Sequence, residues 1–113
     1  MEEIGKNESI RVLIDTDGVV IAEGDIDLAG GPILDSALLR VENTEPTTID
    51  LAAVEFIDSS GLRSLLAASR RAEERGTHVI LRSPSAGVLR LLSITGTTDQ
   101  FHVTGVAADG ADR

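Results

Sequence analysis

A short polar turn at residues 57–62, with the sequence Ile-Asp-Ser-Ser-Gly-Leu, constrains the fold of this chain more than any other stretch. Before it, residues 47–51 form a β-rich run, and residues 54–57 continue as a largely apolar approach. After it, apolar and small residues recur at steps of three and four, as in an amphipathic helix: Leu62, Leu65, Leu66, Ser69 and Ala72. The pattern predicts that a buried strand passes directly into a helix at residues 58–61.

Two residues of this turn can cap the predicted helix. The side chain of Asp58 or of Ser59 can accept a hydrogen bond from an N–H group of the first helical turn, which has no partner within the helix. Ser59, Ser60 and Gly61 then lie at the positive end of the helix dipole, on the surface. The turn is therefore a suitable place to carry or to recognise a phosphate.

The rest of the chain predicts further strands and helices in alternation. The predicted strands are β-rich and mostly apolar, and lie at residues 10–15, 19–22, 47–51, 78–81 and 101–104. Asp17-Gly18 should join the first two as a hairpin with the turn chemistry of two-residue connections. The predicted helices extend from Pro32 to Val41, from the central turn to Gly76, and from a cap at Ser85 to Gly96.

This order predicts one α/β domain. Strand-helix-strand crossovers of this length imply parallel strands with right-handed connections, so we expect an antiparallel first strand, a mostly parallel sheet and helices packed on it. The last helix should turn an inner stripe of Val88, Leu91, Leu92 and Thr95 to the core. The domain is expected at residues 10–104, with residues 1–9 and 105–113 as flexible termini.

Composition excludes several classes of protein. A net charge of −9 and only two aromatic residues, both Phe, argue against binding to nucleic acid. The arginines of the central helix alternate with Glu73 and Glu74, as on a solvated helix face. The absence of Cys excludes disulfides and thiolate metal sites. Since there is no apolar run long enough for a bilayer and no export leader, we expect a soluble cytoplasmic protein without membrane contact.

The sequence gives little support for a catalytic site or for a metal-binding or nucleotide-binding site. Ser59 with His78 or His102 as base would require a strained nucleophile elbow, which is missing, and both histidines lie on predicted strands away from the turn. Asp25, Asp27 and Asp58 could be imagined as Mg²⁺ ligands, but we interpret them as surface acidic groups. The glycines near Gly30 lack dinucleotide-binding spacing. We therefore expect no enzyme activity, no metal and no cofactor.

Four motifs, in order, resemble the STAS (sulphate transporter and anti-sigma factor antagonist) domain, in its small free-standing bacterial form. They are Gly24-Asp25-Ile26-Asp27, Ile49-Asp50-Leu51, the segment 56–62, and the segment from Ser83-Pro84-Ser85 through Leu91-Leu92 to Thr95-Gly96. The resemblance extends over residues 10–103. It implies the same mostly parallel sheet with an antiparallel N-terminal strand and packed helices.

The resemblance also implies a partner-switching regulator. In this family an anti-sigma factor serine kinase phosphorylates the first Ser of the motif, here Ser59, and a metal-dependent, PP2C-type phosphatase resets it. The unphosphorylated domain binds the kinase and frees the sigma factor. The docking surface implied for this chain consists of Asp25, Asp27, Asp58, Ser59, Ser60, Gly61 and Leu62.

The same fold allows a second role. The chain could be the STAS subunit of a larger transport or signalling assembly, in which Ser59 is not modified. Binding that ignores the charge at Ser59 would distinguish this role from partner switching.

Overall fold

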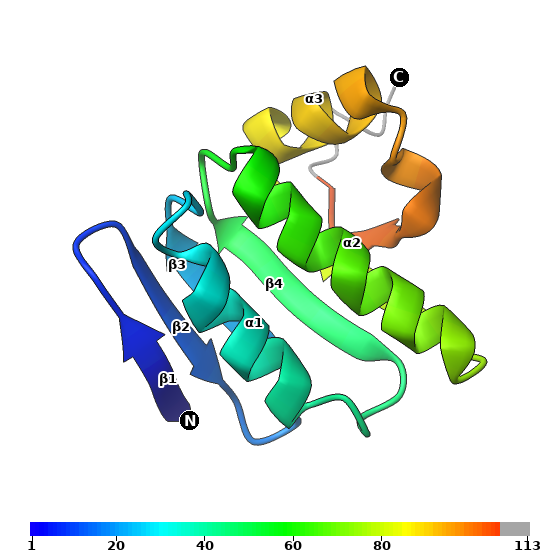
Figure 1. Cartoon of the computed structure of the whole chain (residues 1–113), viewed down its shortest axis with the longest axis horizontal. Helices are drawn as coiled ribbons and strands as arrows, with labels where there is room; N and C mark the ends of the chain where they lie inside the picture. Colours follow the sequence, from blue (N-terminus) through cyan, green and yellow to red (C-terminus); the bar gives the residue numbers. More distant parts are fainter. Residues whose placement is uncertain (107–113) are drawn as a thin grey trace.

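The computed structural model describes residues 1–106, which form one sheet with helices on it (Figure 1). The six strands lie side by side in their sequence order. They are β1 Glu2–Lys6, β2 Ile10–Ile14, β3 Val20–Gly24, β4 Thr47–Ala53, β5 Val79–Arg82 and β6 His102–Thr104. β1 pairs with β2 and β2 with β3 in antiparallel fashion, whereas β3 to β6 are parallel. The predicted mixed α/β sheet is thus confirmed.

Three α-helices and a short 3₁₀ turn connect the parallel strands. They are α1 Gly31–Arg40, α2 Ser59–Glu74, α3 Ala86–Thr95 and η1 Thr98–Gln100. α1 and α2 lie against one another on one face of the sheet, and α3 lies beyond the end of the sheet at which β4 finishes (Figure 1). Because β3 to β6 are parallel, each connecting segment returns the chain to the same end of the sheet. As a result, the turn before α2 lies at the carboxyl ends of β3 and β4.

The N-terminus is a strand and not the frayed end that its polar sequence predicted. Glu2–Lys6 pairs with β2 along its length, and Ile4 packs against the core. The charged residues have partners: the Glu3 carboxylate accepts from Arg11 Nε at 2.8 Å, and Glu2 accepts from Arg40. Residues 2–6 are therefore part of the sheet, and their charged side chains are typical of an edge strand.

The hairpin between β2 and β3 is longer than predicted. Its connection is residues 15–19, not a two-residue turn. The Asp15 carboxylate accepts from the N–H groups of Asp17 at 2.8 Å and Val19 at 2.9 Å, and Gly18 takes a φ of +82°. The Asp15 side chain thus holds the loop together with a backbone hydrogen bond from the Asp15 N–H to the Val19 carbonyl at 3.0 Å.

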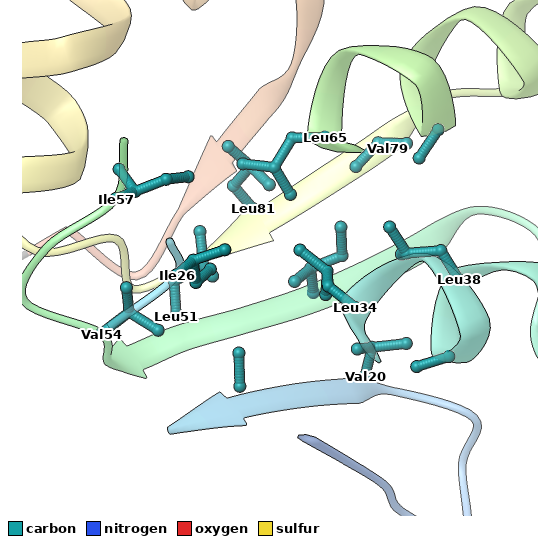
Figure 2. Packing of buried hydrophobic residues seen from close by; sticks show 14 of the residues in the cluster. Val20, Ile26, Leu34, Leu38, Leu51, Val54, Ile57, Leu65, Val79 and Leu81 are labelled. Atoms are coloured by element: carbon teal, nitrogen blue, oxygen red, sulfur yellow. The ribbon is translucent and has the colours of Figure 1, made fainter. Parts of the chain in front are cut away.

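The core lies between the sheet and the α1–α2 layer (Figure 2). Its fully buried members from strands and helices alike are aliphatic, among them Val20, Ile49, Leu51, Leu81, Leu34, Leu38 and Leu65. Alternate residues of β4 point inward, as a pleated strand requires. The apolar stripe of α2 is confirmed, with Leu62 and Leu65 buried and Leu66 half-buried.

The third helix departs from its predicted stripe at one residue. Val88 and Leu92 are buried, but Thr95 is exposed and donates its hydroxyl to the Leu91 carbonyl at 2.8 Å. The predicted cap and end of this helix are confirmed: Ser85 Oγ accepts from Val88 N, and Gly96 is left-handed. Most of the predicted C-terminal tail, residues 107–113, lies outside the described residues.

Candidate functional site

The first turn of α2 is capped by Asp58. Its Oδ1 accepts from the N–H of Ser60 at 2.8 Å and from that of Gly61 at 3.1 Å, while its backbone is extended. This single carboxylate oxygen satisfies two of the amide groups that a helix start leaves without partners. Of the two caps that the sequence allowed, the structure therefore uses Asp58 and leaves the Ser59 side chain free of that task.

Ser59 is the first residue of α2, and its side chain is exposed. Among residues 1–106 its hydroxyl makes no hydrogen bond to another protein group. Ser60 is half-buried beside it. The predicted surface hydroxyl at the positive end of the helix is thus present, and it is open to a reagent or a protein from outside.

Gly61 and Leu62 lie beneath this surface. A Cβ at Gly61 would be 2.6 Å from Ile26 Cγ2 and 2.7 Å from Ile57 Cγ1, so only glycine lets the helix start come this close. Leu62 is 6% exposed. These two residues of the predicted docking surface hold the turn in place from below, and their direct contact with a partner stays a prediction.

The loop after β3 is joined to the turn before α2. Ile26 N donates to the Phe56 carbonyl at 3.0 Å, Asp58 N donates to the Ile26 carbonyl at 3.1 Å, and Ile26 bridges Ile57 in parallel register. This short ladder brings Asp25 and Asp27 to the same end of the sheet as Ser59. The structure therefore unites the motifs that the sequence separates by thirty residues.

The two acidic residues of that loop, Asp25 and Asp27, differ in exposure and in hydrogen bonding. Asp25 is exposed, whereas Asp27 is half-buried and its Oδ1 accepts from Gly30 N at 3.0 Å. Asp27 thus holds the turn that leads into α1. Within the described residues, no group of three or more acidic or His side chains is placed to hold a metal ion.

A groove between α1 and α2, with a volume of about 310 Å³, opens next to the capped turn. Leu28, Gly31, Pro32 and Asp35 line one wall, and Ser60, Arg63, Ser64 and Ala67 line the other. The side chain of Leu28 at its rim is 75% exposed. Sequence reasoning missed this groove because it depends on how the two helices pack. The one local signal was Leu28, a large apolar residue directly after Asp27 in the loop before α1.

A second hollow, of about 190 Å³, lies on the other side of the turn. The segment before α2 contributes Glu55, Phe56 and Ile57, and α3 contributes Gly87, Arg90, Leu91 and Ile94. The side chain of Phe56 is 52% exposed and that of Ile94 is 74% exposed. Each of the two hollows thus carries an exposed apolar side chain, and their linings include residues that precede and follow Ser59 in the sequence. Exposed apolar groups of this kind are typical of a protein-binding surface.

The two histidines are remote from this site. His78 and His102 stack on each other, with ring centroids 3.9 Å apart and planes 17° from parallel. The His78 carbonyl accepts from the N–H of Thr47, the first residue of β4, whereas Ser59 follows the opposite end of that strand. Neither imidazole is placed to act as a base on Ser59. None of the helices in residues 1–106 has the length and apolarity needed to cross a membrane.

Comparison with known proteins agrees with this geometry. Residues 12–105 match the family described as "Mlab, STAS domain". The chain is 30% identical over 98 residues to an anti-sigma-B factor antagonist of Listeria monocytogenes, covering 84% of this chain and 86% of that protein. A crystal structure of an anti-sigma factor antagonist from Mycobacterium paratuberculosis is 30% identical and superposes with a TM-score of 0.72, with 93% of both chains covered.

A more distant relative shares the fold. The phosphorylated form of the Bacillus cell fate determinant SpoIIAA is 18% identical and superposes with a TM-score of 0.59, over 91% of this chain and 96% of that chain. Fold and site together define a small α/β domain with a serine-bearing turn at one end of its sheet. The chain belongs to the STAS domain family.

Proposed function

We propose that this chain is a non-catalytic anti-sigma factor antagonist, and that phosphorylation of Ser59 controls it. In its unphosphorylated form it binds an anti-sigma factor serine kinase, which then releases its sigma factor. The kinase phosphorylates Ser59, the complex separates, and a PP2C-type phosphatase restores the hydroxyl. The observation that carries this proposal is the exposed Ser59 side chain, which does not cap the helix because Asp58 does so.

The physical basis of the switch is burial of charge in the complex. A phosphate carries a charge of about −1.5 to −2 at neutral pH. If a partner covers Ser59, that charge must leave water, at a cost of at least several kcal/mol unless the partner pairs it. Since about 2.8 kcal/mol already corresponds to a hundredfold change in affinity, phosphorylation is sufficient to separate the complex without any change in the domain itself.

Two observations support the proposed role. The relatives with 29–30% identity are named anti-sigma-B factor antagonists, and their matched segments extend over most of both chains. The Bacillus protein with the same fold has been solved in a phosphorylated form, so a phosphate is compatible with the fold.

Affinity capture with a charge series tests the proposal. Immobilised wild-type chain should retain an anti-sigma factor kinase from a lysate of the source organism, and the purified kinase should bind Ser59→Asp at least a hundredfold more weakly in calorimetry. Thr16→Asp is the matched control, because Thr16 is exposed on the hairpin at the opposite end of the sheet. With ATP, the kinase should label the wild type and Ser60→Ala, and fail to label Ser59→Ala.

Other outcomes would support other roles. Stable binding of a partner that ignores Ser59→Asp would favour a STAS subunit of a larger assembly. Turnover of a substrate that is lost in Ser59→Ala would favour an enzyme.

A further inference from the structure

Arg63 lies one helical turn after Ser59 on α2. Residues four apart on a helix are surface neighbours, and an acidic group that precedes a basic one at this spacing is the favourable orientation. The two Cα atoms are separated by about 6 Å along the helix axis. Both side chains are exposed. A phosphate on Ser59 would therefore occupy the acidic position of an i, i+4 ion pair.

The direction of the Arg63 side chain fits this pairing. Long helical side chains lean toward the helix N-terminus, so each covers the turn that precedes it. Arg63 accordingly lines the groove together with Ser60, which belongs to the first turn of the helix. Its guanidinium can thus reach the space above Ser59 by rotation of side-chain torsions alone.

Arg63 also differs from most arginines of the domain in having no ion partner. Five arginines lie within 4.0 Å of a carboxylate: Arg11, Arg40, Arg71, Arg75 and Arg82. Within residues 1–106, Arg63 makes no such contact, although Asp35 lines the opposite wall of the same groove. The cation is thus available, and no existing pair has to break for it to meet a new anion.

We propose that Arg63 is the internal counter-ion of the phosphate on Ser59, and that this pairing draws its guanidinium away from the rim of the α1–α2 groove. The inference rests on the proposed modification of Ser59. Arg63 forms a charge-assisted hydrogen bond to a phosphate oxygen. Phosphorylation then changes the surface at two points: it adds negative charge at the turn, and it removes a free cation from the adjoining groove.

The pairing has a consequence for the dephosphorylated state. In a domain with a net charge of −9, Arg63 is an unpaired cation in the groove that Asp35 also lines, one helical turn after the Asp58 cap. A partner that places an acidic group over the groove meets this cation only when Ser59 is unmodified. Arg63 is therefore expected to increase the difference in partner affinity between the unmodified and the phosphorylated domain.

Phosphoserine introduced at position 59 by genetic encoding tests the pairing without any kinase. The pH midpoint of the ³¹P chemical-shift titration is expected to be higher in Arg63→Gln than in the phosphorylated wild type by about 0.2–0.4 pH unit. Arg70→Gln is the matched control, because Arg70 is an exposed arginine of the same helix that lies about 16 Å from Ser59 along the helix axis. It should leave the midpoint unchanged, and Arg63→Lys should restore part of the shift.

Equal midpoints in the wild type, Arg63→Gln and Arg70→Gln would overturn the pairing. Far-UV circular dichroism and thermal unfolding of each variant verify that the fold is intact, which is expected because Arg63 is exposed. This experiment distinguishes a failure of the pairing from a failure of the proposed function. The pairing can form in a protein that no kinase modifies, and a kinase can modify Ser59 even if the midpoints do not differ.

Discussion

Gly61 approaches Ile26 so closely that a Cβ at position 61 would lie 2.6 Å from the Ile26 Cγ2. Ile26 is fully buried and belongs to the loop after β3, whereas Gly61 belongs to the first turn of α2. The glycine of the Asp-Ser-Ser-Gly-Leu motif therefore fixes where the helix start lies on the sheet. It also fixes the distance between the Asp25–Asp27 loop and Ser59.

Replacement of Gly61 by alanine should destabilise the domain. Alanine is the better helix former by about 1 kcal/mol, but its methyl group would overlap Ile26 and Ile57, whose β-branched side chains have little freedom to move. Overpacking of a core costs about 1–3 kcal/mol, so we expect a net loss of unfolding free energy, measured by urea denaturation.

Gly31→Ala is the control for that measurement. Gly31 is also the first-turn glycine of a helix, but a Cβ there would meet Ser64 Oγ at 3.5 Å and the Ser60 carbonyl oxygen at 3.9 Å, both ordinary contacts. Its stability should be unchanged or raised by less than about 1 kcal/mol. A Gly61→Ala protein as stable as Gly31→Ala would show that the helix start is not held by this contact.

Loss of the Asp58 side chain should weaken the start of α2. Asp58→Ala removes the acceptor of two first-turn amides, and a lost N-cap costs about 0.5–2 kcal/mol. Asp58→Asn retains a capping oxygen and should recover most of the stability in the same urea titration. Asp58→Ala with wild-type stability would instead assign the cap to Ser59, the alternative that the sequence allowed.

Much of this site was predictable because it is encoded locally. The strand, the polar turn, the amphipathic stripe from Leu62 and the left-handed glycine at position 76 are contiguous in sequence, and each follows from periodicity or cap chemistry. The choice of Asp58 over Ser59 as cap was not predictable, because both side chains can reach the same amides and only the backbone path decides between them.

Features that depend on distant contacts were missed. β1 is charged, and nothing in residues 2–6 alone indicates the Arg11 and Arg40 partners that hold it. The same holds for the groove beside Ser60, which exists only because α1 packs against α2. Thr95 was misplaced because a helical stripe of finite width leaves its last member free to face solvent.

Hydrogen exchange can verify that the N-terminus is a strand. Amide protons of residues 2–6 that point toward β2 should exchange at least about tenfold more slowly than in an unstructured peptide, a local opening cost of about 1.4 kcal/mol, whereas those on the open edge should not. Ile4→Ala should reduce this protection, because Ile4 packs on the core. Arg40→Gln should change it little, because exposed ion pairs contribute about 0–1 kcal/mol. Exchange at intrinsic rates in the wild type would favour a frayed end.

Phosphorylation of Ser59 should leave the isolated domain unchanged. A negative charge at a helix N-terminus gains about 0.3–1 kcal/mol, while its repulsion with Asp58 costs about 1 kcal/mol at 4 Å in water and about 4 at an effective dielectric of 20. Because Ser59 is exposed, the value in water applies, and the two opposed effects are then of similar size. The fold should therefore be retained, and ¹H–¹⁵N spectra should differ only near residues 57–63. Chemical-shift changes across the core-facing residues of α2 would show that the helix repacks. Phosphorylation would then act by a conformational change and not by placing charge in the interface.

The exposed apolar residues beside Ser59 should matter for binding and not for stability. Phe56 is 52% exposed and Leu28 75% exposed, so truncation of either to alanine should alter unfolding free energy by less than about 0.5 kcal/mol. At the centre of an interface, a buried aromatic contributes about 2 kcal/mol or more, so Phe56→Ala should weaken binding of the captured kinase more than tenfold.

Leu39→Ala is the control, because Leu39 is 54% exposed at the far end of α1. Equal binding by Phe56→Ala, Leu28→Ala and Leu39→Ala would place the docking surface elsewhere on the domain.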